Sequence, residues 1–154
     1  MDALLDHFAG VHGWPRATKV SVVSGFESYN LCLRGGFNFL LVDRAIAGAS
    51  REDLFLLNVA RQPLGRAITV VRIRPHGNGR PSPEKMECEL RYTRGQLGEC
   101  EYSQSSRFRV ASTDLSNGLP GPDSCFPLFL VLNSVLGDDG GKNWIEVRAR
   151  IIFS

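Results

Sequence analysis

The stretch VDRAIAGASREDLFLLNVARQPLGRAITVVRIRP, residues 42–75, decides the fold, because its pattern changes half-way along. Its middle part, residues 51–61, is apolar on most sides of a helix and follows Ser50, whose hydroxyl can cap a helix N-terminus. Asp53 stands where a capping box places an acid, and Pro63 marks a helix end. We therefore predict an α-helix over residues 51–61, the one helix in a chain that otherwise has the pattern of strands.

The predicted helix is too apolar to be exposed on one side only. Leu54, Phe55, Leu57, Val59 and Ala60 leave little polar surface on it. Such a helix must be covered on most sides, either as a plug over the open end of a barrel or as a flank against a neighbouring subunit. We accordingly place Phe55 and Leu57 at an oligomer interface.

The rest of the chain alternates apolar and polar residues with the two-residue period of strands. The predicted strands are 19–24, 31–33, 37–42, 67–74, 86–92, 98–103, 107–111, 128–135 and 144–153. In the last of them, Arg148 and Arg150 alternate with an apolar row that includes Ile151, which is typical of a strand with one wet face. We add Arg148 and Arg150 to the predicted interface.

Length and composition describe one ordinary globular unit. The chain has 154 residues, of which 43% are hydrophobic and 22% charged, and we predict a single domain over residues 1–154. A net charge of +2 is too small to indicate nucleic acid or an anionic membrane as a partner. No apolar run reaches the roughly 18 residues of a membrane helix, and the N-terminus lacks the basic region of a signal peptide. We expect a cytoplasmic protein, with export by a specialised secretion system left open.

No familiar catalytic or cofactor motif occurs in the sequence. It lacks the glycine-rich nucleotide-binding patterns and the G-x-S-x-G of hydrolases. The acidic turn at residues 138–141 has too few carboxylates for a calcium site. A basic string of Arg72, Arg74 and Arg80 with Lys85 could contact phosphates, but we interpret it as a solvated edge. We therefore expect no enzyme, no cofactor and no metal.

The four cysteines have no zinc-site spacing. Cys32, Cys88, Cys100 and Cys125 include no C-x-x-C pair. We predict reduced thiols, and a Cys88–Cys100 bridge across a hairpin is the alternative.

The order of these elements resembles the Hcp family, the haemolysin-coregulated proteins that form the inner tube of type VI secretion systems. A start like the family's G-I-x-G-E-S is matched within the turn expected at residues 10–13. The fixed residues of the segment F-x-F-x-x-x-x-D-x-x-S-P-x-L have counterparts, in the same order, at Phe37, Phe39, Asp43, Ser50 and Leu54, with a longer spacer between Asp43 and Ser50. The resemblance covers residues 8–103 and 143–153.

That resemblance implies a small β-barrel of two packed antiparallel sheets with one flanking helix. It implies a structural, secreted homo-oligomer that forms hexameric rings, which stack into a tail tube. Its partners would be further copies of itself and the sheath, spike or effector proteins of the secretion apparatus, with no nucleic acid and no membrane. Two alternatives are a small viral or phage-type β-barrel or jelly-roll shell or decoration protein, and a ligand-binding β-barrel or small enzyme.

Overall fold

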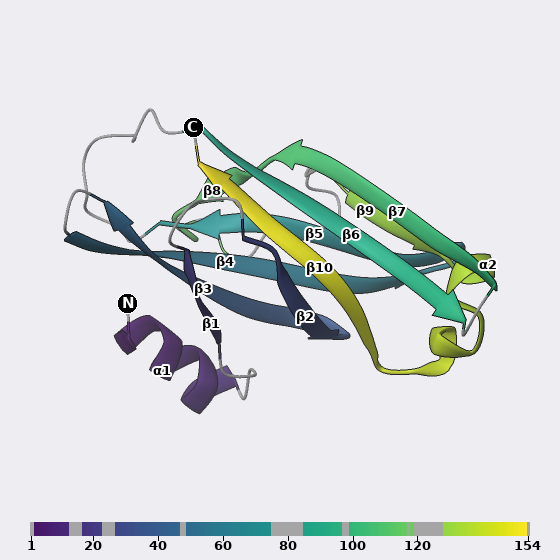
Figure 1. The fold of residues 1–154 in the computed structure, drawn as a ribbon. Coiled ribbons are helices and arrows are strands. Elements are labelled where there is room, and N and C mark those ends of the chain that lie inside the picture. The colour runs from purple at the N-terminus through teal and green to yellow at the C-terminus, as the bar shows by residue number, and fades with distance from the viewer. Residues whose placement is uncertain are drawn as a thin grey trace.

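The computed structural model of the chain describes residues 2–12, 17–22, 27–46, 49–74, 85–96, 99–116, 118 and 128–153. These residues form a six-stranded sheet and a four-stranded sheet that pack face to face, with one helix outside them (Figure 1). The mainly β class and the two packed sheets predicted from the sequence are confirmed.

The six-stranded sheet, here called sheet A, has the order β1-β3-β4-β5-β8, with β9 also pairing with β5. Its strands are β1 (Thr18–Val22), β3 (Gly36–Ile46), β4 (Ala49–Gln62), β5 (Gly65–Ile73), β8 (Ala111–Thr113) and β9 (Leu128–Leu132). Strands β1 and β3 run parallel, as do β5 and β8, and the remaining pairs are antiparallel. Sheet A is therefore mixed, which corrects the expectation of two purely antiparallel sheets.

The four-stranded sheet, here called sheet B, has the order β2-β10-β6-β7. Its strands are β2 (Tyr29–Arg34), β10 (Trp144–Phe153), β6 (Met86–Gln96) and β7 (Glu99–Arg109). All its pairs are antiparallel, and β6 and β7 form the predicted hairpin.

The predicted helix over residues 51–61 is wrong, because this segment is part of the long strand β4. Leu54 and Leu56 lie on the outer face of sheet A, and Phe55 and Leu57 lie between the sheets; all four are buried. A strand covered on both faces has a continuous apolar run, which also fits a buried helix. The hydroxyl of Ser50 caps no helix and donates to the Asp43 carboxylate on β3.

The main helix is instead α1 (Asp2–His12), and it covers part of the outer face of sheet A. Phe8 is 7% exposed, and its ring stacks on that of Phe39 with the centroids 5.0 Å apart. Residues 10–12, where a turn was expected, belong to this helix.

The apolar run 128–135 is only partly a strand. After β9 the chain forms a short helix, α2 (Asn133–Leu136), and a 3-10 helix, η1 (Gly137–Gly141), over the predicted acidic turn. Gly65 begins β5 where that strand approaches β9. A Cβ there would lie 2.1 Å from the Val131 carbonyl oxygen, so a larger residue cannot fit without moving the backbone. The strand expected at 107–111 divides between β7 and β8.

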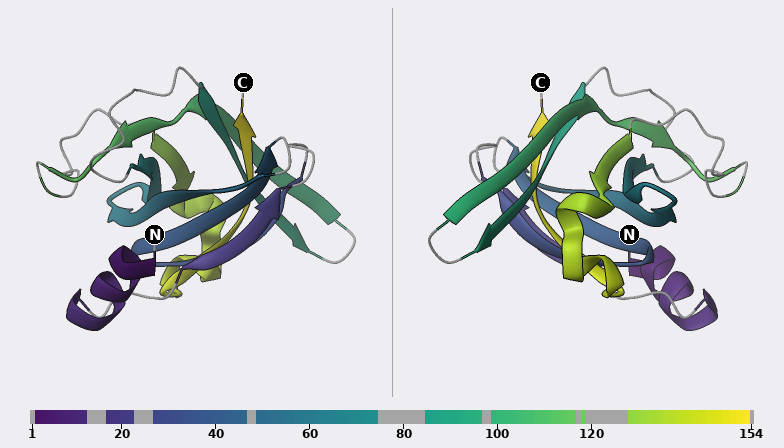
Figure 2. Two further views of the ribbon diagram at one scale, coloured as in Figure 1. Left: turned by 90° about the vertical axis from the view of Figure 1, so that its left-hand side faces the viewer. Right: turned by 90° about the vertical axis from the view of Figure 1, so that its right-hand side faces the viewer.

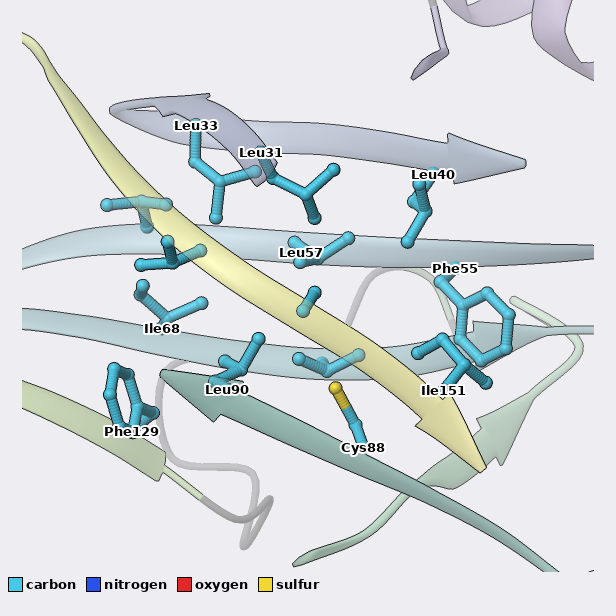
Figure 3. Close-up of a cluster of buried hydrophobic side chains, with 14 of the residues drawn as sticks. Leu31, Leu33, Leu40, Phe55, Leu57, Ile68, Cys88, Leu90, Phe129 and Ile151 are labelled. Atoms are coloured by element: carbon cyan, nitrogen blue, oxygen red, sulfur yellow. The ribbon is translucent and has the colours of Figure 1, made fainter. Parts of the chain in front are cut away.

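The core lies between the two sheets, where side chains of both meet (Figure 3). It includes Leu40, Phe55, Ile68, Leu90, Phe129 and Ile151, each no more than 2% exposed. Cys88 is fully buried among them and its thiol is free, as is that of Cys32, so a Cys88–Cys100 bridge is excluded. Cys125, Arg80 and most of the segments 75–85 and 112–127, which contain none of the predicted strands, lie outside the described residues.

Candidate functional site

The outer face of sheet B carries polar side chains from each of its four strands. Strand β10 shows why: Ile145, Val147 and Ala149 are 3%, 1% and 1% exposed, while Glu146 and Arg148 between them are exposed. Successive side chains of a strand point to opposite faces. The apolar row therefore closes the core, and the polar row faces outward.

The neighbouring strands add polar residues directly opposite this row. Arg148 pairs with Asn30 of β2 on one side and with Arg91 of β6 on the other, and Arg91 pairs with Ser105 of β7. We call this surface the polar face. Its members are Asn30, Cys32, Arg34, Glu87, Glu89, Arg91, Thr93, Ser103, Ser105, Arg107, Arg109, Trp144, Glu146, Arg148 and Arg150.

The polar face carries a positive balance, because its arginines outnumber its glutamates. Glu87 accepts a hydrogen bond from Arg107 Nε at 2.8 Å. Glu89 lies 3.6 Å from Arg91, measured from Oε1 to Nη2. Arg148 has a neutral neighbour, with its Nε 3.3 Å from Asn30 Oδ1. The face as a whole therefore favours an anionic partner.

Two hollows open on this face. One, of about 440 Å³, is lined among others by Asn30, Trp144 and Thr93, and the other has about 110 Å³. Arg91 and Arg148 line both hollows. These two arginines are thus the centre of the candidate site.

The end of the larger hollow is held in place by hydrogen bonds to main-chain carbonyls. Arg66 of β5 donates from Nη1 to the Trp144 carbonyl at 2.8 Å and from Nη2 to the Gly140 carbonyl at 3.2 Å. Burial lowers the pKa of Arg66. The Gly35 amide donates to the Asn143 carbonyl at 3.0 Å. The start of β10 is therefore fixed, while the Trp144 side chain stays 39% exposed.

A tyrosine joins the two sheets beside the smaller hollow. Tyr29 of β2 donates its hydroxyl to the Ser21 carbonyl at 2.7 Å, and Glu27 Oε2 lies 3.2 Å away. Burial, and then the hydrogen bond and negative charge of Glu27, raise the pKa of Tyr29 to about 12. Tyr29 is therefore neutral at physiological pH and ties β2 to β1.

A second group of charges lies between the sheets, at one end of the core. Asp53 of β4 accepts from Arg44 Nε at 2.9 Å and from Arg72 Nη2. The three side chains are 3–7% exposed. Arg44 also lies over the Phe153 ring, with Cζ 3.8 Å from the centroid. Arg72 is thus buried, which corrects its assignment to a solvated edge.

The four predicted interface residues separate into two pairs. Arg148 lies exposed on the polar face with Arg150, which is partly buried. Phe55 and Leu57 are 0% and 1% exposed within one chain, so they belong to its core instead of a surface offered to a neighbour (Figure 3). The alternation of β10 predicted that Arg148 and Arg150 lie on the outward face of the strand. Arg91 and Asn30 were missed because the sequence does not show which residues of distant strands lie opposite each other.

Within the described ranges, no group of three or more His, Cys, Asp or Glu side chains is placed to hold a metal ion. Neither α1 nor α2 combines the length and apolar character that a membrane-spanning helix needs.

A scan against known protein families gives no match for this chain, and a search among curated proteins gives none either.

Proposed function

We propose that the chain is a structural subunit that assembles with copies of itself through the edges of sheet B, in the manner of the Hcp tube proteins it resembles. The observation that supports this proposal best is the edge of β7. Among the described residues, no strand pairs with the outer edge of β7 or with that of β2. In Figure 2 the β6–β7 hairpin extends to one side of the other strands.

The β7 edge lacks two of the residue types that commonly keep edges apart, proline and lysine, although it carries other charged side chains near both ends. The strand is 11 residues long and contains neither proline nor lysine. Soluble proteins commonly block edge strands with those residues, because an exposed edge is a template for another chain. A long edge without them favours pairing between chains.

Strand direction also suits a join between β7 and β2 of a second copy. Sheet B has four strands that alternate in direction, so β7 runs opposite to β2. A neighbour's β2 placed beside β7 in the same orientation would continue the antiparallel pattern. Such a head-to-tail contact gives a ring if its rotation closes and a filament if it does not.

In that assembly the polar faces of successive copies would form one continuous surface. Arg148 and Arg150 would then face a wet lumen or a polar outer surface. By the same resemblance, partners would include sheath, spike or effector proteins, and the subunit would be made in the cytoplasm and exported by a secretion apparatus. Assembly of this kind needs no catalysis and no cofactor.

The resemblance also implies that the two sheets close into a small barrel, and in a closed barrel β7 would pair within the chain instead of with a neighbour. Closure would need β7 to pair with β9 of the same chain. One contact supports it, a hydrogen bond of 2.8 Å from Gln104 Nε2 to the Leu130 carbonyl. The β7 edge can pair either with β9 of the same chain or with a strand of a neighbouring copy. Amide hydrogen exchange along β7, measured with and without assembly, distinguishes these two kinds of pairing.

The test is the mass in solution by light scattering after gel filtration, with negative-stain images of the same peak. Successive amides of a strand point to opposite edges. Of the two variants Ser105→Pro and Ser106→Pro, one therefore loses an amide on the free edge of β7, and the other loses an amide that bonds to β6. We expect rings for the unchanged chain, and for one of the two variants a folded monomer of normal melting temperature. A compact monomer for the unchanged chain would contradict the proposal.

A further inference from the structure

We propose that the polar face binds a nucleoside phosphate, with the phosphoryl group held between Arg91 and Arg148 and the ring placed against Trp144. The site lies within one chain, so the inference does not depend on assembly.

The first observation is a pair of like charges placed directly opposite each other. Arg91 and Arg148 are cross-strand partners, and their row contains only Asn30 and Ser105 beyond them. Like charges directly opposite on a sheet are destabilising. An anion between the two guanidinium groups would offset this repulsion.

The second observation is that both guanidinium groups keep free donors. In the described part of the chain, the carboxylate oxygen nearest to Arg91 is Glu89 Oε1, at 3.6 Å. Among the described residues, Arg148 Nε donates to the neutral amide oxygen of Asn30, at 3.3 Å. Arginine binds phosphate oxygens with two parallel N–H donors, so the pair can offer two forks to one phosphoryl group.

The third observation is the shape of the site. The hollow of about 440 Å³ extends from the arginine pair to Trp144. Trp144 lies four residues before Arg148 on the same face of β10, a separation of about 13 Å along a strand. An exposed indole gives a stacking surface for a planar base, and the distance suits a ligand that carries a ring at one end and a phosphoryl group at the other.

Nearby cations strengthen the preference for an anion. Arg34 is the cross-strand partner of Trp144, and Lys142 Nζ lies 4.8 Å from the indole centroid. Two carboxylates also line the hollow, Glu146 of β10 and Asp139 of η1. Lys142 Nζ pairs with Asp139 Oδ1 at 2.6 Å, so these two charges offset each other, and the charge of Glu146 is opposed by Arg34 and by the arginine pair.

The probe is adenosine 5′-monophosphate, titrated into the ¹⁵N-labelled full chain and followed by amide and indole NMR signals. Trp144→Phe assigns the Trp144 indole signal. Adenosine and inorganic phosphate are titrated separately. We expect the Trp144 indole and the amides around Arg91 and Arg148 to shift with the monophosphate, and affinity to fall about tenfold or more without either half of the ligand.

The decisive variants are Arg91→Gln and Arg148→Gln, with Arg107→Gln as the matched control. Arg107 is on the same face but is paired with Glu87. We expect each of the first two to weaken binding about tenfold or more, and the control to leave it unchanged. No shift up to about 5 mM ligand, or equal loss in all three variants, would overturn the inference.

A short single-stranded oligonucleotide distinguishes two sources of the same ligand chemistry. If it binds more tightly than the monophosphate and loses affinity with the same two variants, the nucleotide is taken from a strand. If the monophosphate binds equally well or better, the ligand is the free nucleotide. Both results support the site, and oligonucleotide binding that ignores the two variants counts against it.

Discussion

Arginine has opposite surroundings in two regions of this molecule. Between the sheets, Arg44 and Arg72 are 6% and 4% exposed and share the carboxylate of Asp53. On the polar face, Arg91 and Arg148 are exposed and stand opposite each other as cross-strand partners, and Glu89 Oε1 lies 3.6 Å from Arg91 Nη2.

The difference teaches which charges the fold depends on. A buried charge is tolerated only with a partner, so removal of Asp53 leaves two buried guanidinium groups without their counter-charge. An exposed charge is solvated whether or not it has a partner. The inner arginines are therefore tied to stability, and the outer arginines are available for binding.

The largest effect on the free energy of unfolding is expected when a carboxylate without a counter-charge is introduced into the core near Asp53. Phe55 lies two residues from Asp53 on the same face of β4. Phe55→Asp should cost more than about 4–5 kcal/mol, which is about a third or more of the stability of a typical domain. Urea unfolding followed by circular dichroism measures it, with Glu52→Gln as a control on the same strand, because Glu52 is partly exposed and pairs with the exposed Lys19. Near-normal stability of Phe55→Asp would show that the core lies elsewhere.

The second effect concerns the shared carboxylate itself. Asp53→Asn should lower the free energy of unfolding by about 3–5 kcal/mol, because Arg44 and Arg72 lose their counter-charge. The triple variant Arg44→Met, Asp53→Leu, Arg72→Met should recover most of that loss, since apolar residues can replace a buried ion cluster. If the triple variant is as unstable as the single one, packing and not charge controls this end of the core.

A third effect compares a buried thiol with an exposed one. Burial, and to a lesser extent the charge of Glu89, raise the pKa of Cys88 to about 12, against about 8.5 in an unfolded chain. The folded state thus prefers the neutral thiol. The contribution of the neutral Cys88 thiol to the free energy of unfolding is complete below about pH 8.5, and it is lost as the pH rises from there towards about 12.

Two measurements check this sign. Iodoacetamide at about pH 8.5 should label Cys32, which is exposed, and spare Cys88 in the folded chain, as read by mass spectrometry. The free energy of unfolding should fall across the alkaline range, and Cys88→Ala should remove the part of the fall that begins near pH 8.5. Rapid labelling of Cys88 under native conditions would contradict its burial.

The smallest effect is expected on the polar face. Arg91→Gln and Arg148→Gln should change the free energy of unfolding by no more than about 0.5 kcal/mol, with a gain favoured because each relieves a like-charge pair. Urea unfolding of both, beside Arg72→Gln as the buried counterpart, gives the comparison directly. A loss as large as that of Arg72→Gln would remove the distinction between the two regions.

Sequence reasoning succeeded where one face of a strand is wet. The alternation of residues 144–153 predicted β10 and the outward position of Arg148. It failed for β4, because a strand buried on both faces loses its alternation and a serine followed by acids resembles a helix start. It also missed α1, although Leu4 and Phe8 have the four-residue spacing of a helix face. The arginine pair of the site could not be predicted, since it depends on a register between strands far apart in the chain.

The position of β10 in the middle of sheet B has a consequence for synthesis. Strand β2 pairs only with β10 within sheet B, and the contacting residues Asn30 and Arg148 are 118 positions apart. A nascent chain must therefore be translated through residue 153 before β2 and β6 can be joined. Until then β3, β4 and β5, which follow one another closely, can pair while their inner apolar face stays uncovered. Such long-range closure is slow and leaves the unfinished chain prone to aggregation, so we expect the ribosome-bound intermediate to need chaperone protection until β10 emerges.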